Sequence, residues 1–409
     1  MKLINKIFLL WLLPSLIFAS GKYPSPLPTP SAEVLNIETQ KCNTSCLEEL
    51  LEQGQVFSFI ANFTQNNQNQ TLLESLNTLM STLEISQIPY FTDSQKSFFN
   101  IALLFSRKDI GAYSASTTNV ILSYLLHQNK LFNFEIFDSK SESAQDLQEA
   151  INTIHSKGYR QIIAILTYNG ANNLNTLNIQ TPIFIPSVHS SQITTNPLPN
   201  IIYGGISYEK QIQKLSKHNS QIKAVSFYDS SYIGDQIHQS VLKYNPDIAY
   251  STAFNLKDNS NFTKTAGKLK SLLKHSRIFL NTPVINSSII LSQLTYYDIA
   301  IEGIYSTQIN YSPTLLSITQ PKDRKNMYIA NSIQTLDSLL SEETQMLNAD
   351  LKYDWINYAT AFGIEYFYRK NVPSAKRYFK ETIKDNQVQY EIEILSPINN
   401  RFVESDASF

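Results

Sequence analysis

Hydrophobic positions recur every second residue in some stretches of the chain and every third or fourth residue in others. The clearest change between the two patterns runs from Lys223 to Tyr244. Residues 224–228 are largely apolar on both faces, which predicts a buried parallel strand. From Tyr232 onward the apolar residues follow helical spacing, and residues 229–231 supply a turn and an N-cap. The sequence therefore predicts a strand followed directly by a helix.

Strand-like and helix-like segments alternate from about Phe98 to the end of a second such set near Tyr305. This alternation predicts an α/β architecture with parallel sheets. Gly204 and Gly205 directly follow a predicted strand, and we interpret the pair as a hinge because glycine tolerates unusual dihedrals. Two sets joined at a hinge predict two lobes with a cleft between them. Residues 327–345 and 351–370 are expected to be helical.

The first twenty residues combine a charged start, an apolar run from Ile7 to Phe18 and a small residue at Ala19 or Ser20. This order predicts a signal peptide over residues 1–20. No later apolar run is long enough to span a bilayer, so we expect no integral membrane span in the mature chain. We expect the mature chain to be exported, which in a Gram-negative bacterium means to the periplasm. Residues 21–41 are rich in proline and predict an extended tether.

Residues 42–97 carry two apolar helical faces joined by a polar run, which predicts a helical hairpin. Cys42 and Cys46 are the only cysteines in the chain. In an oxidising compartment this spacing favours a local disulfide. Free thiols, a metal site and a redox pair are the alternatives. The metal site would need further ligands, and a redox pair usually has two intervening residues.

Composition and motifs argue against several classes of function. A net charge of −1, from 33 basic and 34 acidic residues, gives no concentrated basic surface for nucleic acid. The chain contains no nucleophile elbow, H-E-x-x-H, P-loop or G-x-G-x-x-G motif. Its six histidines are scattered. We therefore expect recognition and not catalysis, with no catalytic residue, cofactor or metal.

The loops expected at the cleft are rich in hydroxyl and amide side chains. Such groups orient a small polar solute by hydrogen bonds. The alternative is that they are ordinary solvated turns. The candidate ligand-binding residues are Ser187, His189, Ser190, Ser191, Asp229, Tyr232, Ser306 and Gln308.

Several segments together resemble the type I periplasmic binding protein fold across roughly residues 98–409. These segments are IFIPSVHSS (183–191), DSSYIG (229–234), FTKTAGKLK (262–270) and YATAFGIEYF (358–367). In that fold the chain returns to the first lobe after the second sheet. The resemblance implies a first lobe of residues 98–205 and 307–385, and a second lobe of residues 206–306 and 386–409.

Within this fold, residues 289–310 resemble the C-terminal domain of the lipoprotein activators of penicillin-binding proteins. Those activators carry a helical region before the domain, as this chain does. The chain departs from them because its helical part is one predicted hairpin and because the lipidated cysteine is absent. The resemblance implies an envelope protein as partner.

The chain also resembles the branched-chain amino-acid-binding family. Members of that family hold the ligand's carboxylate with Ser and Thr loops and its ammonium with an acidic residue of the second lobe. Ser190, Ser191 and Tyr232 match the first group, whereas residues 306–308 provide no acidic side chain. An unpaired buried ammonium costs several kcal/mol, which disfavours an ordinary amino acid as ligand.

These observations lead to two hypotheses about function. The preferred one is a periplasmic scaffold or regulator that contacts an envelope protein. The alternative is a solute-binding protein of an ABC-type transporter, with a small polar solute in the interlobe cleft.

Overall fold

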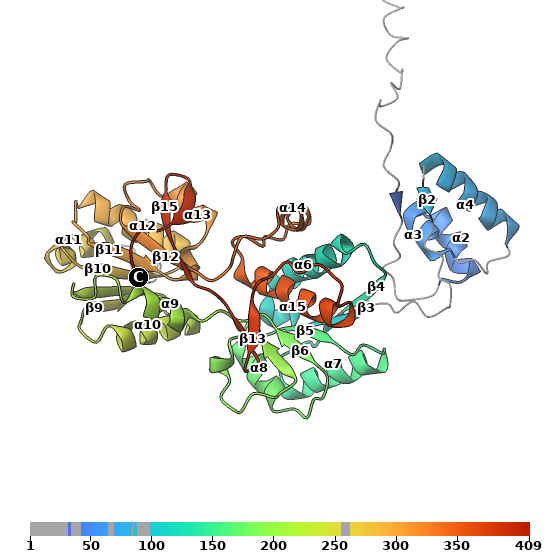
Figure 1. Ribbon diagram of the computed structural model, residues 1–409, viewed down its shortest axis with the longest axis horizontal. Helices are drawn as coiled ribbons and strands as arrows, with labels where there is room; N and C mark the ends of the chain where they lie inside the picture. The colour runs from blue at the N-terminus through green and yellow to red at the C-terminus, as the bar shows by residue number, and fades with distance from the viewer. Residues whose placement is uncertain (1–31, 34–41, 64–68, 84, 88–98, 255–261) are drawn as a thin grey trace, which may run out of the picture. The chain divides into compact units, whose positions relative to one another are not determined.

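The computed structural model describes residues 32–33, 42–63, 69–83, 85–87, 99–254 and 262–409 (Figure 1). The chain divides into two compact units, Met1–Ser97 and Phe98–Phe409. The predicted signal peptide lies outside the described residues, as does most of the predicted tether. In the part of the chain that the structure describes, no helix has both the length and the apolar character needed to cross a bilayer.

The described part of the first unit holds three helices where the sequence predicts a two-helix hairpin. They are α2 (Thr44–Glu52), α3 (Val56–Asn62) and α4 (Gln70–Leu83), with a parallel pair of strands, β1 (Ala32–Glu33) and β2 (Ile85–Gln87). Gly54 explains the additional break, because its φ of 70° is a left-handed conformation that ends a helix. The predicted disulfide between Cys42 and Cys46 is confirmed, and it links the segment just before α2 to the first turn of that helix.

The second unit contains two seven-stranded, mostly parallel sheets, which confirms the predicted two-lobed α/β fold. The sheet of lobe 1 has the order β13-β14-β7-β6-β5-β3-β4, and the sheet of lobe 2 has the order β16-β15-β12-β11-β10-β8-β9. The strands of lobe 1 are β3 (Phe99–Phe105), β4 (Phe132–Asp138), β5 (Ile162–Ile165), β6 (Ile183–Ile185), β7 (Ile201–Tyr203), β13 (Thr382–Lys384) and β14 (Gln387–Gln389). The strands of lobe 2 are β8 (Ala224–Tyr228), β9 (Ile248–Ala253), β10 (Arg277–Asn281), β11 (Gly303–Ser306), β12 (Met327–Asn331), β15 (Glu393–Ile398) and β16 (Arg401–Glu404).

Helices flank both sheets. Those of lobe 1 are α5 (Arg107–Ile110), α6 (Tyr113–His127), α7 (Ala144–Ser156), α8 (Tyr168–Asn175), α14 (Ser338–Met346) and α15 (Trp355–Asn371). Those of lobe 2 are α9 (Tyr208–Leu215), α10 (Tyr232–Tyr244), α11 (Phe262–Leu273), α12 (Val284–Tyr296) and α13 (Pro313–Ile318). The strand and helix predicted within residues 223–244 are present as β8 and α10, and Ser231 caps α10 as expected.

The chain crosses between the two sheets three times, at residues 204–207, 332–337 and 390–392. The expected return point after residue 306 differs from the observed one. Residues 327–331 form a strand, β12, that pairs with β11 in lobe 2, although the sequence predicts a helix there. A short apolar run has no periodicity that separates strand from helix. The last crossing also comes later than expected, because β14 pairs with β7 in lobe 1.

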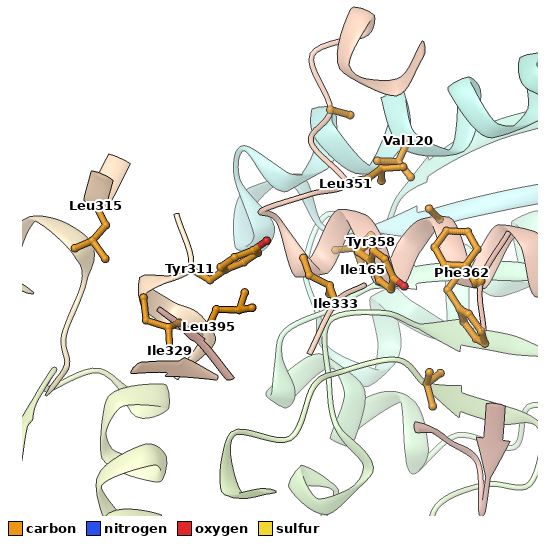
Figure 2. Close-up of a cluster of buried hydrophobic side chains, with 14 of the residues drawn as sticks. Val120, Ile165, Tyr311, Leu315, Ile329, Ile333, Leu351, Tyr358, Phe362 and Leu395 are labelled. Carbon is orange, nitrogen blue, oxygen red and sulfur yellow. The ribbon is translucent and has the colours of Figure 1, made fainter. Parts of the chain in front are cut away.

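Helix α15 is the central helix of lobe 1 and is buried along most of its length. It lies beside α6, which comes from far away in the sequence (Figure 1). Figure 2 shows Tyr358 and Phe362 on α15, among the members of a hydrophobic cluster that continues to Leu395 in lobe 2. Ile333, in the second crossover, belongs to the same cluster. One continuous apolar core therefore includes side chains of both lobes.

Candidate functional site

The order of strands in lobe 1 marks the place where a ligand is expected. Strand β3 lies between β4 and β5, so the strand order changes direction at β3. Helix α6, which follows β3, packs against α15, whereas α8, which follows β5, packs against α7. Ligands of open α/β sheets bind at the carboxyl ends of the strands at such a switch point. A cavity of about 730 Å³ lies there.

Both lobes contribute to this cavity, but unequally. Lobe 1 provides the segments that follow β3, β4, β5 and β6 and the first turn of α15, whereas lobe 2 provides the start of α10. Four aromatic residues line it, and each is the first residue of a helix. They are Tyr113 of α6, Tyr168 of α8, Tyr232 of α10 and Trp355 of α15. The volume and the largely apolar walls are typical of small-molecule sites.

Tyr168 and Tyr232 join the two lobes by a parallel ring stack. Their ring centroids are 3.9 Å apart and their planes differ by 8°. Each tyrosine follows a capping residue: Thr167 and Ser231 accept hydrogen bonds from backbone N–H groups two residues beyond the tyrosines. Desolvation raises the pKa of Tyr232, so its phenol stays protonated at neutral pH. The stack is therefore an aromatic contact between the first residues of two helices, one from each lobe.

Glu142 is the buried acidic residue of the cavity wall, with a relative exposure of 7%. Its Oε1 accepts a hydrogen bond from the backbone N–H of Thr167 (2.8 Å), and its Oε2 accepts one from the Thr167 hydroxyl. Gly170 provides the space for this carboxyl group, because a Cβ at that position would lie 2.5 Å from Glu142 Cδ. The carboxylate therefore occupies the N-terminus of α8.

A smaller cavity of about 100 Å³ adjoins the first one and shares Ser187 with it. His189 and Ser191 line it, and His189 Nδ1 lies 2.8 Å from the Ser191 hydroxyl. Burial, together with nearby Lys210, lowers the pKa of His189 to about 4, whereas Glu209 acts in the opposite direction. The imidazole is therefore neutral at physiological pH.

The remaining predicted residues have mainly structural contacts. Ser187 connects the loop after β6 to the loop after β5. Its hydroxyl donates to the Leu166 carbonyl (2.6 Å) and accepts from the Leu166 N–H (3.2 Å). The backbone N–H of Ser190 donates to Gln387 Oε1 (2.8 Å). The Asp229 carboxylate accepts from the Ser231 N–H (3.0 Å) and so shapes the turn before α10.

The structure does not bring Ser306 and Gln308 to the cavity. Both are buried in lobe 2. The Gln308 amide donates to Asn331 Oδ1 (3.0 Å) and accepts from the Ser332 N–H (2.7 Å), so it supports the second crossover. The Ser306 hydroxyl accepts from the Asn310 side chain (2.8 Å). Their polar groups are already paired inside the lobe, so we withdraw them as cavity residues.

Gly204 and Gly205 lie in the first crossover, but neither has a positive φ. The expected reason for glycine, an unusual dihedral, is therefore wrong. Close approach is the reason that the structure gives: a Cβ on Gly205 would lie 2.3 Å from the Val188 carbonyl carbon, and a Cβ on Gly204 would lie 2.7 Å from the Phe184 ring. The Gly205 carbonyl also accepts from the Gln387 amide (2.9 Å). Hinge motion at this pair stays a prediction.

Comparison with known proteins identifies the fold. No family model matches the chain, and no curated protein matches it significantly. Among solved structures, LivJ of Streptococcus pneumoniae, a branched-chain amino acid transporter substrate-binding protein in complex with isoleucine, is 13% identical with a TM-score of 0.55, covering 75% of this chain and 97% of that one. A branched-chain amino acid ABC transporter periplasmic ligand-binding protein of Burkholderia xenovorans is 11% identical with a TM-score of 0.56, covering 76% and 93%.

The LpoA protein of Haemophilus influenzae, a regulator of PBP1A, also matches. Its C-domain is 12% identical with a TM-score of 0.52, covering 75% of this chain and 99% of that domain. A longer LpoA structure covers 89% of this chain and 72% of its own, again at 12% identity and a TM-score of 0.52. Phe98–Phe409 is about three quarters of the chain, so the longer match extends into the first unit. The second unit has the fold of the type I periplasmic binding proteins.

Proposed function

We propose that this protein is a non-enzymatic recognition protein of the bacterial cell envelope that binds a small ligand between its lobes. The observation that carries the proposal is the cavity of about 730 Å³ at the switch point of lobe 1. Its walls combine aromatic surfaces with a few hydrogen-bonding groups, which is the composition of ligand sites. The similar solved structures named above are binding proteins and a regulator, which supports a role in recognition.

A regulatory role toward an envelope protein is the preferred form of this proposal. The longer LpoA structure supports it, because that match includes part of the helical first unit as well as the lobes. The described helices of the first unit enclose an apolar cluster of their own, which contains Phe59 and Leu76. Export is supported by the signal-like residues 1–20 and by the periplasmic protein of similar fold.

The alternative is a solute-binding protein of a transporter, and the cavity favours it. A receptor of that kind closes its lobes around the solute, so contacts across the cleft decide its affinity. The stack of Tyr168 on Tyr232 is such a contact.

Two assays with two variants distinguish these roles. The first assay is cross-linking in envelope extracts followed by mass spectrometry, and the second is thermal unfolding against a panel of amino acids, peptides, sugars and muropeptide fragments. A regulator loses its cross-linked partner when residues 42–86 are deleted and keeps it in Tyr232→Ala. A transport receptor shows a thermal shift with one solute, which Tyr232→Ala removes and the deletion does not. Saturating ligand at a hundredfold excess over its Kd adds about 2.7 kcal/mol. Absence of both a partner and a shift would refute the proposal.

A further inference from the structure

The charge of the large cavity indicates which class of ligand it accepts, and this inference rests on the binding role proposed for the same cavity. Among the described residues that line it, the charged side chains are Asp109 and Glu142, and none is Lys, Arg or His. Asp109 is exposed and Glu142 is buried. The walls are therefore negative, and four aromatic rings contribute to them.

Helix N-termini usually make a cavity attractive to anions, since they carry partial positive charge and free N–H groups. At α8 and α15, two of the four helices that begin at the cavity, a carboxylate of the protein already occupies this position, whereas Ser231 caps α10 and no side chain caps α6. Glu142 accepts from the Thr167 N–H at the start of α8 (2.8 Å). Asp354 accepts from two N–H groups at the start of α15 (2.9 and 3.1 Å), and Asp229 accepts from Ser231 just before α10 (3.0 Å). The carboxylate of an incoming ligand would compete with these groups.

Basic residues near the cavity do not offset this charge. Arg107 and Lys108 precede Asp109 in α5, but both are exposed and neither lines the cavity. His189 lies in the adjoining smaller cavity, where burial lowers its pKa to about 4 and keeps it neutral at physiological pH.

Aromatic rings and carboxylates together favour positive charge. The faces of tyrosine and tryptophan attract ammonium groups, most strongly when the group is desolvated, and quaternary ammonium ligands are bound in this way. A carboxylate in a partly buried site adds a Coulombic attraction that water screens only weakly. We propose that the cavity binds an organic cation, with an alkylated ammonium group held among Tyr113, Trp355 and the two carboxylates.

Benzyltrimethylammonium and benzoate are suitable probes, because they share a ring and differ in the sign of charge. The full chain with Trp11→Phe keeps Trp355 as its one tryptophan, so quenching of indole fluorescence reports on the cavity. We expect saturable quenching by benzyltrimethylammonium, confirmed by calorimetry, and no competition by benzoate. Glu142→Gln and Asp109→Asn should each lower the affinity for benzyltrimethylammonium about tenfold. The matched control is Glu149→Gln, which removes one exposed charge of α7 outside the lining and should change nothing.

Several outcomes would overturn the proposal. Saturable binding of benzoate, with no binding of benzyltrimethylammonium, would mean that the cavity prefers anions. The proposed role in ligand binding would still stand. Equal affinities in Glu142→Gln, Asp109→Asn and Glu149→Gln would show that the carboxylates do not act on the ligand. Asp109→Asn keeps the test valid if Glu142→Gln unfolds, because Asp109 is exposed. If neither probe binds, a thermal shift with a neutral solute from the thermal unfolding panel would refute the preference for cations. The same result would uphold the proposed role in ligand binding.

Discussion

Replacement of Gly234 by alanine should change the stability of the protein through two effects of opposite sign. Gly234 is the third residue of α10, where alanine should stabilise the helix by about 1 kcal/mol relative to glycine. However, a Cβ at this position would lie 2.0 Å from the carbonyl oxygen of Asp229 and 2.7 Å from its carbonyl carbon. These are backbone atoms, so the turn before the helix must move.

The cost of that movement outweighs the helix propensity. Overpacking of this kind typically costs about 1–3 kcal/mol. The displaced turn also holds the cap, in which Ser231 Oγ accepts from the Gly234 N–H (3.2 Å), and loss of a cap costs about 1 kcal/mol. We therefore expect Gly234→Ala to lower the free energy of unfolding of the second unit by about 1–3 kcal/mol. Because Tyr232 lies in the same turn, the interlobe stack should weaken as well.

Urea unfolding followed by circular dichroism measures this change as a shift of the midpoint at constant slope. Gly267→Ala is the matched control, since Gly267 also lies in a helix of lobe 2, α11. The nearest atoms to its added Cβ would belong to the side chain of Tyr297, at 3.3 Å, and not to the backbone. We expect this control to be neutral or to stabilise by up to about 1 kcal/mol. If both variants shift the midpoint upward, the close approach at Asp229 does not constrain the turn.

Three further predictions concern the stack, His189 and the disulfide. In a double-mutant cycle of Tyr168→Leu and Tyr232→Leu, urea midpoints should give a coupling of about 0.5–1.5 kcal/mol, and a coupling near zero would mean that the rings do not hold the lobes together. The pKa of His189 is about 4 in the folded chain and 6.5 ordinarily, so between these values the unfolded chain binds more protons. The contribution of His189 to stability should therefore fall as the pH drops from 6.5 toward 4, and His189→Gln should remove that contribution from the pH dependence of thermal unfolding; an unchanged slope would contradict the buried neutral imidazole. Replacing Cys42 and Cys46 by serine should destabilise the first unit by about 2 kcal/mol and leave the unfolding of the second unit unchanged, since the bridge closes a short loop within the first unit.

The sequence was sufficient to predict the alternating elements of the second unit and the cap of α10. It misplaced β12, because residues 327–331 form a short apolar run whose state is decided by pairing with β11. Sequence patterns describe local periodicity, whereas the return of the chain to lobe 1 depends on which sheet edge is free. The break at Gly54 had a visible signal, since a lone glycine inside an apolar helical pattern is a possible helix end.

The candidate site was only partly predictable for a similar reason. Ser187, His189, Ser191 and Tyr232 line one or both cavities, and each follows a predicted strand. Ser306 also follows a predicted strand, yet it is the last residue of β11 and its hydroxyl lies in a buried network, and nothing in the sequence distinguishes these two situations. The aromatic residues that open α6, α8 and α15 are far apart in the sequence, so their meeting at one cavity depends on the tertiary fold. An aromatic residue directly after a helix cap is a signal that could have identified Tyr168 and Trp355.

The three crossovers also determine when the two lobes can finish folding. Without β13 to β16, β7 would be an open edge of one sheet and β12 an open edge of the other. Residues 382–404 cover both edges, because β14 pairs with β7 and β15 pairs with β12. Exposed edges of this kind favour association with other chains, and pairings between distant segments form slowly. The two lobes therefore share a single late step of folding, and a chain that still lacks its last strands leaves both edges open to pairing with neighbouring chains.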